Sequence, residues 1–424
     1  MTTQDTGEVE DLDGFRQRAR AFVRVNLRPA DPAVVSARLM LPEEETLAAV
    51  ARERELQRML FDAGLAGICV PREYGGQGLT PDHQQVLNSE LAGYEYPMRL
   101  QIPTFVPCAA VLFDRGTEEQ KQRHLPAILK GDELWVQFLS EPSGGSDMAG
   151  ALTNAVRDGD EWVLNGSKLW TTNASWSDWA LCLARTNWDV PKHRGLTVFM
   201  LPIRQPGIEI RPIEMLNGSK EFCQEFLTDV RVPDSHRVGD VDDGWSVCIR
   251  WMFHERMLFN SPLLTIPAGA APGSVVSPTS MRDIARDAAR LQDPAARDLV
   301  GEAYMLTVAK GELERRLREG IAAGVLSDQA AAIGRVFGAL VSTRTTDIAF
   351  ELAGDTGVAW ANDDGTLANR GTDFLMRQAG CIGGGTAEMA RNVISERVLG
   401  MPREPAADRG IAFRDAPRSH SART

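Results

Sequence analysis

The middle of this 424-residue chain changes from helical to strand periodicity, and that change constrains the fold more than any other feature. The stretch "ALTNAVRDGDEWVLNGSKLW" (151–170) alternates apolar and polar residues in two runs joined by Asp158-Gly159-Asp160. Such alternation is typical of half-buried strands, and an Asp-Gly pair between two runs indicates a tight hairpin. Two further strands are expected in "GLTVFMLPI" (195–203) and "EFLTDVRVP" (225–233). We therefore predict a β domain at residues 134–240.

Helical patterns flank this β domain on both sides. Before it, Thr80-Pro81 is typical of a helix start, and Thr117 with Gln120 fits a capping box. After it, "GWSVCIRWMFHERMLFN" (244–260) predicts a buried helix, 264–280 is rich in Pro, Gly and Ser and predicts a loop, and amphipathic helices follow. The predicted fold class is α+β. Its parts are an N-terminal helical domain (1–133), the middle β-barrel or sandwich domain (134–240), a C-terminal helical bundle (241–403) and a mobile tail (404–424).

Charge and cysteine usage exclude several classes of protein. A net charge of −12 argues against binding to nucleic acid or an anionic membrane, because both are polyanions. The six cysteines and six histidines show no ligand spacing, so we expect free thiols in a reducing cytoplasm and no metal site. The N-terminus lacks the apolar core of a signal peptide, and no apolar run reaches the ~18 residues of a membrane span. A cytoplasmic protein is expected.

The residues best suited to chemistry are concentrated in "QFLSEPSGGSDMAG" (137–150) and "NGSKLWTTNA" (165–174). Backbone N–H groups of the Gly-Ser loop at 143–146 can face a phosphate. Hydroxyl groups are available on Ser140, Thr171 and Thr172. Trp170 offers an aromatic plane for a flat ring. By themselves such loops and strands are also ordinary turns and core, and spacing alone leaves both interpretations open.

These two stretches resemble motifs of the acyl-CoA dehydrogenase family. "SEPSGGSD" (140–147) is similar to the family's T/S-E-P-x-A/G-G-S-D stretch, and "NGSKLWTTN" (165–173) to its N-G-x-K-x-W-x-T/S-N stretch. Further matches are "PREYGGQG" (71–78), "GTEEQKQRHLP" (116–126) and "ISERVLG" (394–400). The resemblance covers roughly residues 10–403. It implies FAD as cofactor, an acyl-CoA thioester as substrate, an electron-transfer flavoprotein as acceptor, and a homo-oligomer, either a dimer or a homotetramer.

The resemblance also assigns cofactor-binding residues, position by position. Gln137, Leu139 and Ser140 are expected against the isoalloxazine ring, and Gly145 and Ser146 at the FAD pyrophosphate. Trp170 is expected to cover one face of the ring, Thr172 to hydrogen-bond near N5, and Thr171 to contribute to cofactor binding. The contacts expected from the neighbouring subunit are Glu351, Gly354, Thr386 and Glu388. Glu351 and Glu388 depart from the family by replacing amides, and the family's R-x-x-F-G stretch, expected near 264–280, is absent.

The C-terminal stretch "CIGGGTAEMARNVISERVLG" (381–400) has Gly384 where the family usually carries its catalytic Glu. In isovaleryl-CoA and long-chain acyl-CoA dehydrogenases the base is a Glu on another helix, directly before an Arg. Glu255-Arg256 in "MFHERML" resembles that arrangement and makes Glu255 the candidate base. Residues expected at the substrate are Ser146, Arg256, Gly384 and Gly385, with the Gly384 N–H as donor to the thioester oxygen. The alternative is that Glu255 pairs with a neighbouring cation and is structural.

The leading hypothesis is FAD-dependent α,β-dehydrogenation of an acyl thioester, carried on CoA or on an acyl carrier protein, to the trans-2-enoyl product. Glycines at 383–385 suggest room for a branched, long or ring-bearing acyl group. The combination of "HER" (254–256) with "GGGT" (383–386) resembles actinobacterial members of the family that act on bulky or sterol-derived acyl groups, some of them heteromeric. Two alternatives use the same fold: a flavin monooxygenase or N-hydroxylase, and a non-catalytic subunit of a heteromeric dehydrogenase.

Overall fold

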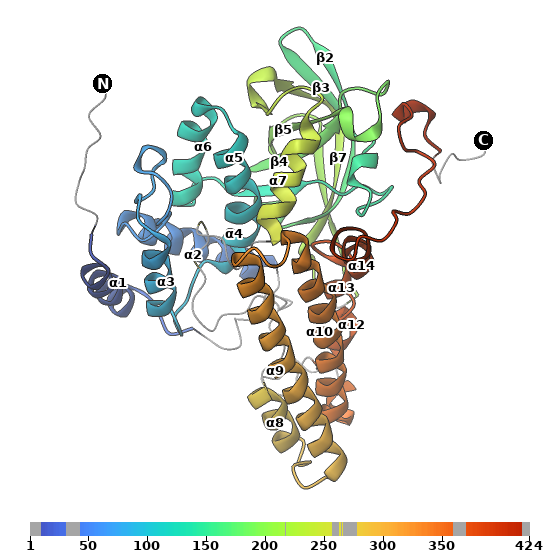
Figure 1. The fold of residues 1–424 in the computed structure, drawn as a ribbon. Coiled ribbons are helices and arrows are strands. Elements are labelled where there is room, and N and C mark those ends of the chain that lie inside the picture. Colours follow the sequence, from blue (N-terminus) through green and yellow to red (C-terminus); the bar gives the residue numbers. More distant parts are fainter. Residues whose placement is uncertain are drawn as a thin grey trace. The chain divides into compact units, whose positions relative to one another are not determined.

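The computed structural model describes residues 10–30, 43–216, 218–256, 263, 265, 278–358 and 370–417. These residues belong to two compact units. The first unit contains the N-terminal helices, every described strand, one further helix and the segment from Ala407 onward. The second unit contains the helices between Ala271 and Ala406. Figure 1 shows the N-terminal helices in blue to cyan, the sheet in green, and the helices of the second unit in gold to red.

The first part of the chain is helical, as predicted. Its helices are α1 (Leu12–Asn26), α2 (Glu43–Asp62), α3 (Pro81–Glu90), α4 (Met98–Pro103), the π-helical η2 (Thr104–Ala109), α5 (Ala110–Arg115) and α6 (Glu118–Lys130). The predicted capping box at the start of α6 is confirmed. The Thr117 hydroxyl accepts from the Gln120 N–H at 3.2 Å, and the Gln120 side chain accepts from the Thr117 N–H at 3.0 Å. Thr80 and Pro81 likewise begin α3.

An eight-stranded sheet follows. Its strands are β1 (Trp135–Phe138), β2 (Asn154–Asp158), β3 (Glu161–Thr172), β4 (Trp179–Arg185), β5 (Leu196–Pro202), β6 (Ile208–Ile213), β7 (Phe222–Pro233) and β8 (Arg237–Val238). The order is β6-β7-β3-β2-β4-β5-β8, with β1 parallel to β4. The predicted hairpin joins β2 to β3, where Asp158 pairs with Glu161 and Gly159 takes the left-handed φ of 63° that the turn requires. The predicted order of helices, sheet and helices is confirmed.

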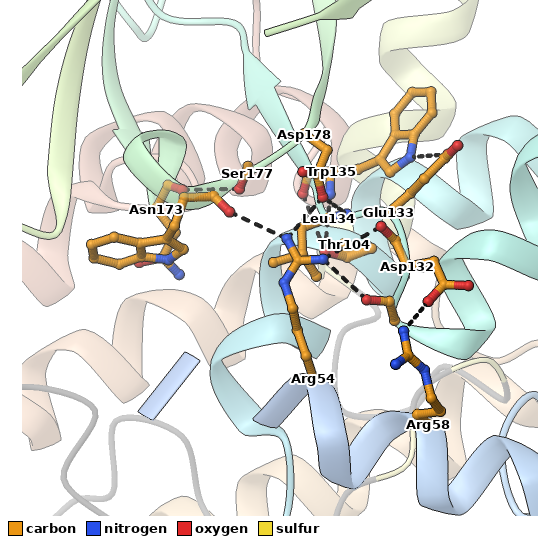
Figure 2. A network of polar contacts seen from close by, with 12 residues as sticks. Arg54, Arg58, Thr104, Asp132, Glu133, Leu134, Trp135, Asn173, Ser177 and Asp178 are labelled. Atoms are coloured by element: carbon orange, nitrogen blue, oxygen red, sulfur yellow. Dashed lines mark hydrogen bonds and ion pairs between the residues drawn. The ribbon is translucent and has the colours of Figure 1, made fainter. Parts of the chain in front are cut away.

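A polar network joins α2 to the residues just before β1 and to the turn between β3 and β4 (Figure 2). The Arg54 guanidinium donates to the Asp178 carboxylate at 2.8 Å and to the Gly131 carbonyl at 3.2 Å. The same Asp178 oxygen accepts from the Leu134 N–H at 2.9 Å, just before β1. Ser177 donates to the carbonyl of Asn173, which directly follows β3. Through Asp178, Arg54 therefore ties α2 to the residue before β1 and to the residue before β4.

The helix after the sheet, α7 (Gly244–Arg256), is buried along one face. Val247, Cys248 and Trp251 are fully buried, whereas Ile249 and Phe253 are 51% and 38% exposed in the described structure. The sequence predicted a buried helix here, and in the described structure the burial is confined to one face. The remainder of that predicted stretch, 257–260, lies outside the described residues.

The regular secondary structure described in the second unit is helical, and none of the described strands belongs to it. Its helices are α8 (Pro278–Asp287), α9 (Pro294–Ala322), α10 (Ala331–Ala353), α11 (Asp355–Val358), α12 (Arg370–Met376), α13 (Ala379–Ile382), α14 (Ala387–Val393) and the π-helical η9 (Ile394–Val398). Buried residues of α8, α9 and α10 form its core, among them Ile284, Ala303 and Ile348. Of the loop predicted at 264–280, residues 264 and 266–277 lie outside the described residues, and 278–280 already belong to α8.

The end of the described chain packs on the sheet, in contrast to the mobile tail that its composition predicted. Phe413 is 5% exposed, and its ring lies 3.7 Å from the guanidinium carbon of Arg185. Its N–H donates to the Val190 carbonyl at 2.9 Å. Arg185 is itself buried and donates to the carbonyls of Ala149 and Ala151, which leaves the flat face of the guanidinium for an aromatic ring. Residues 407–417 therefore belong to the first unit.

We expect Phe413→Ala to lower the free energy of unfolding by about 3 kcal/mol, because it removes a buried aromatic ring and exposes the Arg185 face. Cleavage by trypsin after Arg409 and Arg414 should accelerate in the same variant. The control is Ile411→Ala, which truncates a side chain that is already 36% exposed. Unchanged stability and unchanged cleavage in Phe413→Ala would show that the packing is not maintained in solution.

Candidate functional site

The candidate site in the first unit lies where β1 ends beside the end of β3. Leu139 and Ser140 directly follow β1, and the Ser140 carbonyl accepts from the Leu169 N–H at 2.9 Å. The Thr171 hydroxyl lies 3.2 Å from the Gln137 carbonyl. The structure thus brings together two predicted groups of residues that are separate in sequence, 137–140 and 170–172. These two segments are called the platform below.

Trp170 interrupts the regular pairing of β3 with β7. The register shifts between Leu169 and Thr171, and Trp170 takes a positive φ of 67°. This bulge leaves its indole 50% exposed, although large aromatic side chains are usually buried. The indole contacts Phe222 edge-on, with ring centroids 6.0 Å apart. This exposed indole within the platform is suited to cover a flat ring.

The buried ion pair between Lys168 and Glu141 supports the platform. Lys168 is fully buried, and its ammonium donates to Glu141 at 2.8 Å, to the Leu183 carbonyl at 2.7 Å and to the Leu139 carbonyl at 3.3 Å. Glu141 also accepts from the N–H groups of Leu152 and Thr153. Burial alone would raise the pKa of Glu141, but the Lys168 ammonium and the hydrogen-bond donors outweigh it and hold that pKa below its usual range. All three ammonium protons therefore have acceptors, as a buried charge requires.

The Gly-Ser loop after Glu141 is exposed, so its backbone groups are accessible to a ligand. Gly145 lies close to the platform, because a Cβ added there would be 3.1 Å from the Ser140 hydroxyl. Ser146 is exposed, and the next residue, Asp147, forms an ion pair with Lys192 at 2.9 Å. The loop that carries Gly145 and Ser146 is thus held next to Ser140.

Glu255 lies near the end of α7 and is half-buried. Burial raises the pKa of the buried Cys108 thiol on η2, and the negative charge of the Glu255 carboxylate raises it further. The Glu255 carboxylate therefore influences the interior between α7 and η2. One turn earlier, the indole N–H of Trp251 is buried and has no hydrogen-bond partner among the described residues. His254 contacts Asp114 instead, at 2.8 Å. Arg256 is the last residue of α7, and its side chain lies outside the described part of the chain.

The remaining predicted residues belong to the second unit. Gly384 and Gly385 have positive φ values of 69° and 97°, which glycine adopts without strain. The Arg335 guanidinium on α10 donates to the carbonyls of Gly383 and Gly385 at 2.6 and 2.9 Å and so holds this loop. Thr386 caps α14 by accepting from the Met389 N–H at 3.0 Å.

The two acidic departures from the family lie on exposed helix positions of the same unit. Glu351 is exposed near the end of α10, three residues before Gly354 with its φ of 58°. Glu388 is exposed in the first turn of α14, 3.4 Å from Arg391. Residues 137–172 and 255 thus lie on one unit, and 351–354 and 384–388 on the other. Assembly of one site from both remains a prediction.

Sequence reasoning missed one group close to the platform, the buried carboxyl of Glu225 on β7. Its Oε2 lies 2.9 Å from the Thr171 hydroxyl, and the residue is fully buried. The alternation of β7 contained the signal, because Glu225 shares a face with the apolar Cys223 and Leu227. An acidic residue on an apolar strand face is a reason to look for a function.

The described residues contain neither a candidate metal site nor a candidate membrane span. Nowhere in the described ranges do three His, Cys, Asp or Glu side chains gather in a way that could hold a metal ion. Among the described helices, none combines the length and apolarity needed to span a membrane.

Comparisons with known proteins agree with this architecture. Residues 10–132 match the family "Acyl-CoA dehydrogenase, N-terminal domain" and 137–230 match "Acyl-CoA dehydrogenase, middle domain". Acyl-CoA dehydrogenase IpdE1 of Mycobacterium tuberculosis is 32% identical over 396 residues, covering 93% of this chain and 99% of that protein. Acyl-CoA dehydrogenase FadE34 of the same organism is 33% identical over 382 residues, 89% of this chain, but the chain spans only 49% of its length.

Solved structures give the same result. The structure titled "Tcur3481-Tcur3483 steroid ACAD" is 27% identical with a TM-score of 0.72, covering 95% of this chain and 100% of that one. The ChsE4-ChsE5 complex from Mycobacterium tuberculosis is also 27% identical, with a TM-score of 0.67 and the same coverage.

Proposed function

The chain belongs to the acyl-CoA dehydrogenase family, and on that premise we propose that it uses FAD to dehydrogenate an acyl-CoA thioester between Cα and Cβ, giving the trans-2-enoyl product. The observation that carries this proposal is the platform, where the ends of β1 and β3 are joined by hydrogen bonds beside an exposed indole. Backbone groups, hydroxyls and an exposed aromatic plane side by side are suited to a flat, hydrogen-bonding ring system.

The residues present fit a flavin. The Gln137 amide oxygen is buried and has no partner among the described residues, so it is an unused acceptor at the platform. Trp170 would cover one face of the ring, with Leu139 and Ser140 along its edge and Thr171 and Thr172 near N5. Gly145 and Ser146 would hold the pyrophosphate through exposed backbone and hydroxyl groups. When bound, FAD supplies the acceptor for the β-hydride.

Glu255 is proposed as the base that removes the α-proton. Support comes from its place on α7, where one face is apolar and buried and where the carboxylate acts on the Cys108 region. His254, its neighbour, is already held by Asp114 and is not needed for this role. The Gly384 N–H is proposed as a donor to the thioester oxygen, and Gly385 and Arg256 as further contacts to the substrate. Removal of the proton and charge stabilisation at the oxygen are both required, because the α-proton is weakly acidic.

The subunit partners and the substrate class are proposed from two observations. Three consecutive positions, 383–385, carry no side chain, which leaves space for a bulky acyl group. One solved relative is titled a steroid enzyme, and two are named as pairs of proteins. We therefore favour a ring-bearing acyl-CoA over an acyl carrier protein conjugate, an electron-transfer flavoprotein as acceptor, and either a homotetramer or a heteromer that supplies Glu351, Gly354, Thr386 and Glu388 to a neighbouring flavin.

The experiment is anaerobic titration of the purified yellow protein with short straight-chain, branched and steroid-derived acyl-CoAs. We expect loss of the oxidised flavin absorbance with the ring-bearing substrate and slower or no bleaching with butyryl-CoA. Rapid reoxidation by air with oxygen inserted into a substrate would contradict the proposal and indicate a monooxygenase. A colourless protein that takes up FAD only with a second gene product would indicate a non-catalytic or heteromeric subunit.

A further inference from the structure

Glu225 is a buried acid that the proposed reaction leaves without a role. On β7 it lies opposite Lys168 of β3 and opposite Ile210 of β6, and it is fully buried. Its Oε2 contacts the Thr171 hydroxyl at 2.9 Å, and its Oε1 has no hydrogen-bond partner among the described residues. A buried carboxylate with one oxygen unpaired is costly, whereas a buried carboxylic acid is much less so.

The Thr171 hydroxyl lies between two oxygen atoms but carries a single proton. One oxygen is Glu225 Oε2 at 2.9 Å, and the other is the Gln137 carbonyl at 3.2 Å. With Glu225 ionised, both are acceptors, so the hydroxyl can donate to only one of them. With Glu225 protonated, the acid donates to Thr171 and Thr171 donates to Gln137. Both contacts are then hydrogen bonds.

We propose that Glu225 is a positioning residue that carries a proton in the folded protein and, through Thr171, holds the Gln137 carbonyl and with it the platform for the flavin ring. This inference rests on the proposed function for the identity of the ligand. The proton on Glu225 does not depend on that function, since it follows from the contacts of this chain alone.

The surroundings of Glu225 favour the protonated acid. Lys168 is the nearest cation, but its ammonium is already bonded to Glu141 and to the Leu183 and Leu139 carbonyls. The thiols of Cys182 and Cys223 also lie nearby, and burial raises the pKa of both, so they stay neutral. Burial raises the pKa of Glu225 to about 7, against smaller opposing effects of the Thr171 bond and the Lys168 charge.

The direction of the pH dependence follows from this shift. An acid with a pKa raised by folding binds its proton more tightly in the folded state than in the unfolded chain. Its contribution to stability is therefore full below the unfolded pKa of about 4.5 and falls as the pH rises to about 7, above which it is constant. Over the same range the Thr171 proton turns from Gln137 to Glu225, which weakens the link between β1 and β3.

The test compares wild-type protein with Glu225→Gln between pH 5 and 9. Gln has nearly the same shape, cannot ionise, and can donate to Thr171 as the protonated acid does. Two quantities are measured for each protein: the midpoint of thermal unfolding of the flavin-free chain, and the Kd for FAD from quenching of flavin fluorescence. We expect the wild-type unfolding midpoint to fall relative to that of Glu225→Gln as the pH rises to about 7. Over the same range FAD affinity should weaken about tenfold in the wild type only, because one hydrogen bond contributes about that much to an equilibrium constant.

Two further variants separate the protonation of Glu225 from its link to the platform through Thr171. Thr171→Val removes the hydroxyl that joins Glu225 to Gln137, so FAD affinity should lose its pH dependence while the stability profile keeps it. Glu209→Gln on the exposed strand β6 is the matched control and should leave both profiles as in the wild type.

Parallel stability profiles in wild-type protein and Glu225→Gln would overturn the proton on Glu225. A stability difference without any change in the pH dependence of FAD affinity would overturn its link to the platform. Absence of FAD binding at every pH in both proteins would overturn the proposed function instead, and the unfolding profiles would still support or overturn the protonated acid.

Discussion

Glu255→Gln is expected to lower the rate of flavin reduction by an acyl-CoA roughly 10³-fold while FAD stays bound. The amide keeps the shape of the side chain on α7 but cannot take the α-proton. The half-buried carboxylate of Glu255 also influences the buried Cys108 thiol, which places it beside the interior between α7 and η2. The measurement is anaerobic stopped-flow reduction of the bound flavin, followed at the oxidised absorbance band.

The matched control for this prediction is His254→Asn on the same helix. His254 contacts Asp114 rather than the interior reached by Glu255, so its loss should change the reduction rate little. Introducing Glu at position 384 into Glu255→Gln tests the alternative base position. Gly384 has a φ of 69°, a strained value for Glu that costs about 1 kcal/mol, so only partial recovery is expected. An undiminished rate in Glu255→Gln would sink the assignment of the base.

The parts of the fold that were predictable depend on local chemistry. The hairpin at Asp158-Gly159 needs only a residue that tolerates positive φ between two alternating runs, and the cap at Thr117 needs only a side chain within one turn. The bulge at Trp170 is different, because its register is set by pairing with β7, far along the chain. Sequence similarity could name Trp170, but only the sheet shows why its indole is exposed.

The contacts that sequence reasoning missed all depend on tertiary pairing. Polar composition around Phe413 predicted mobility, since nothing in that segment indicates the flat guanidinium face that Arg185 offers. The Glu225 carboxyl and its Thr171 contact arise from neighbouring positions on two paired strands, and neither strand shows them alone. For the candidate site, the residues of the platform were named from the resemblance and the structure brings them together, while their contact with a flavin stays a prediction. The glycine loop is held by Arg335, which no motif singled out.

Lys168→Met is expected to lower the free energy of unfolding by about 3–5 kcal/mol, the usual cost of breaking a buried ion pair from one side. Met fills a similar volume but leaves the buried Glu141 carboxylate without its cation, and it leaves the Leu183 and Leu139 carbonyls without their shared donor. Because Leu139 belongs to the platform, FAD affinity should fall as well. Denaturant unfolding, with flavin retention on gel filtration, measures both effects.

The double variant Glu141→Gln with Lys168→Met should recover part of this loss, because no uncompensated charge is then buried. A second signature lies in the pH dependence. In the wild type the pKa of Glu141 is lowered by folding, so its stabilising contribution is present above the unfolded pKa and is lost on acidification. Without Lys168, burial becomes the dominant effect and raises that pKa, so stability should instead increase on acidification. Equal stability of Lys168→Met and wild type, with the same pH slope, would mean that the Lys168–Glu141 pair does not support the platform.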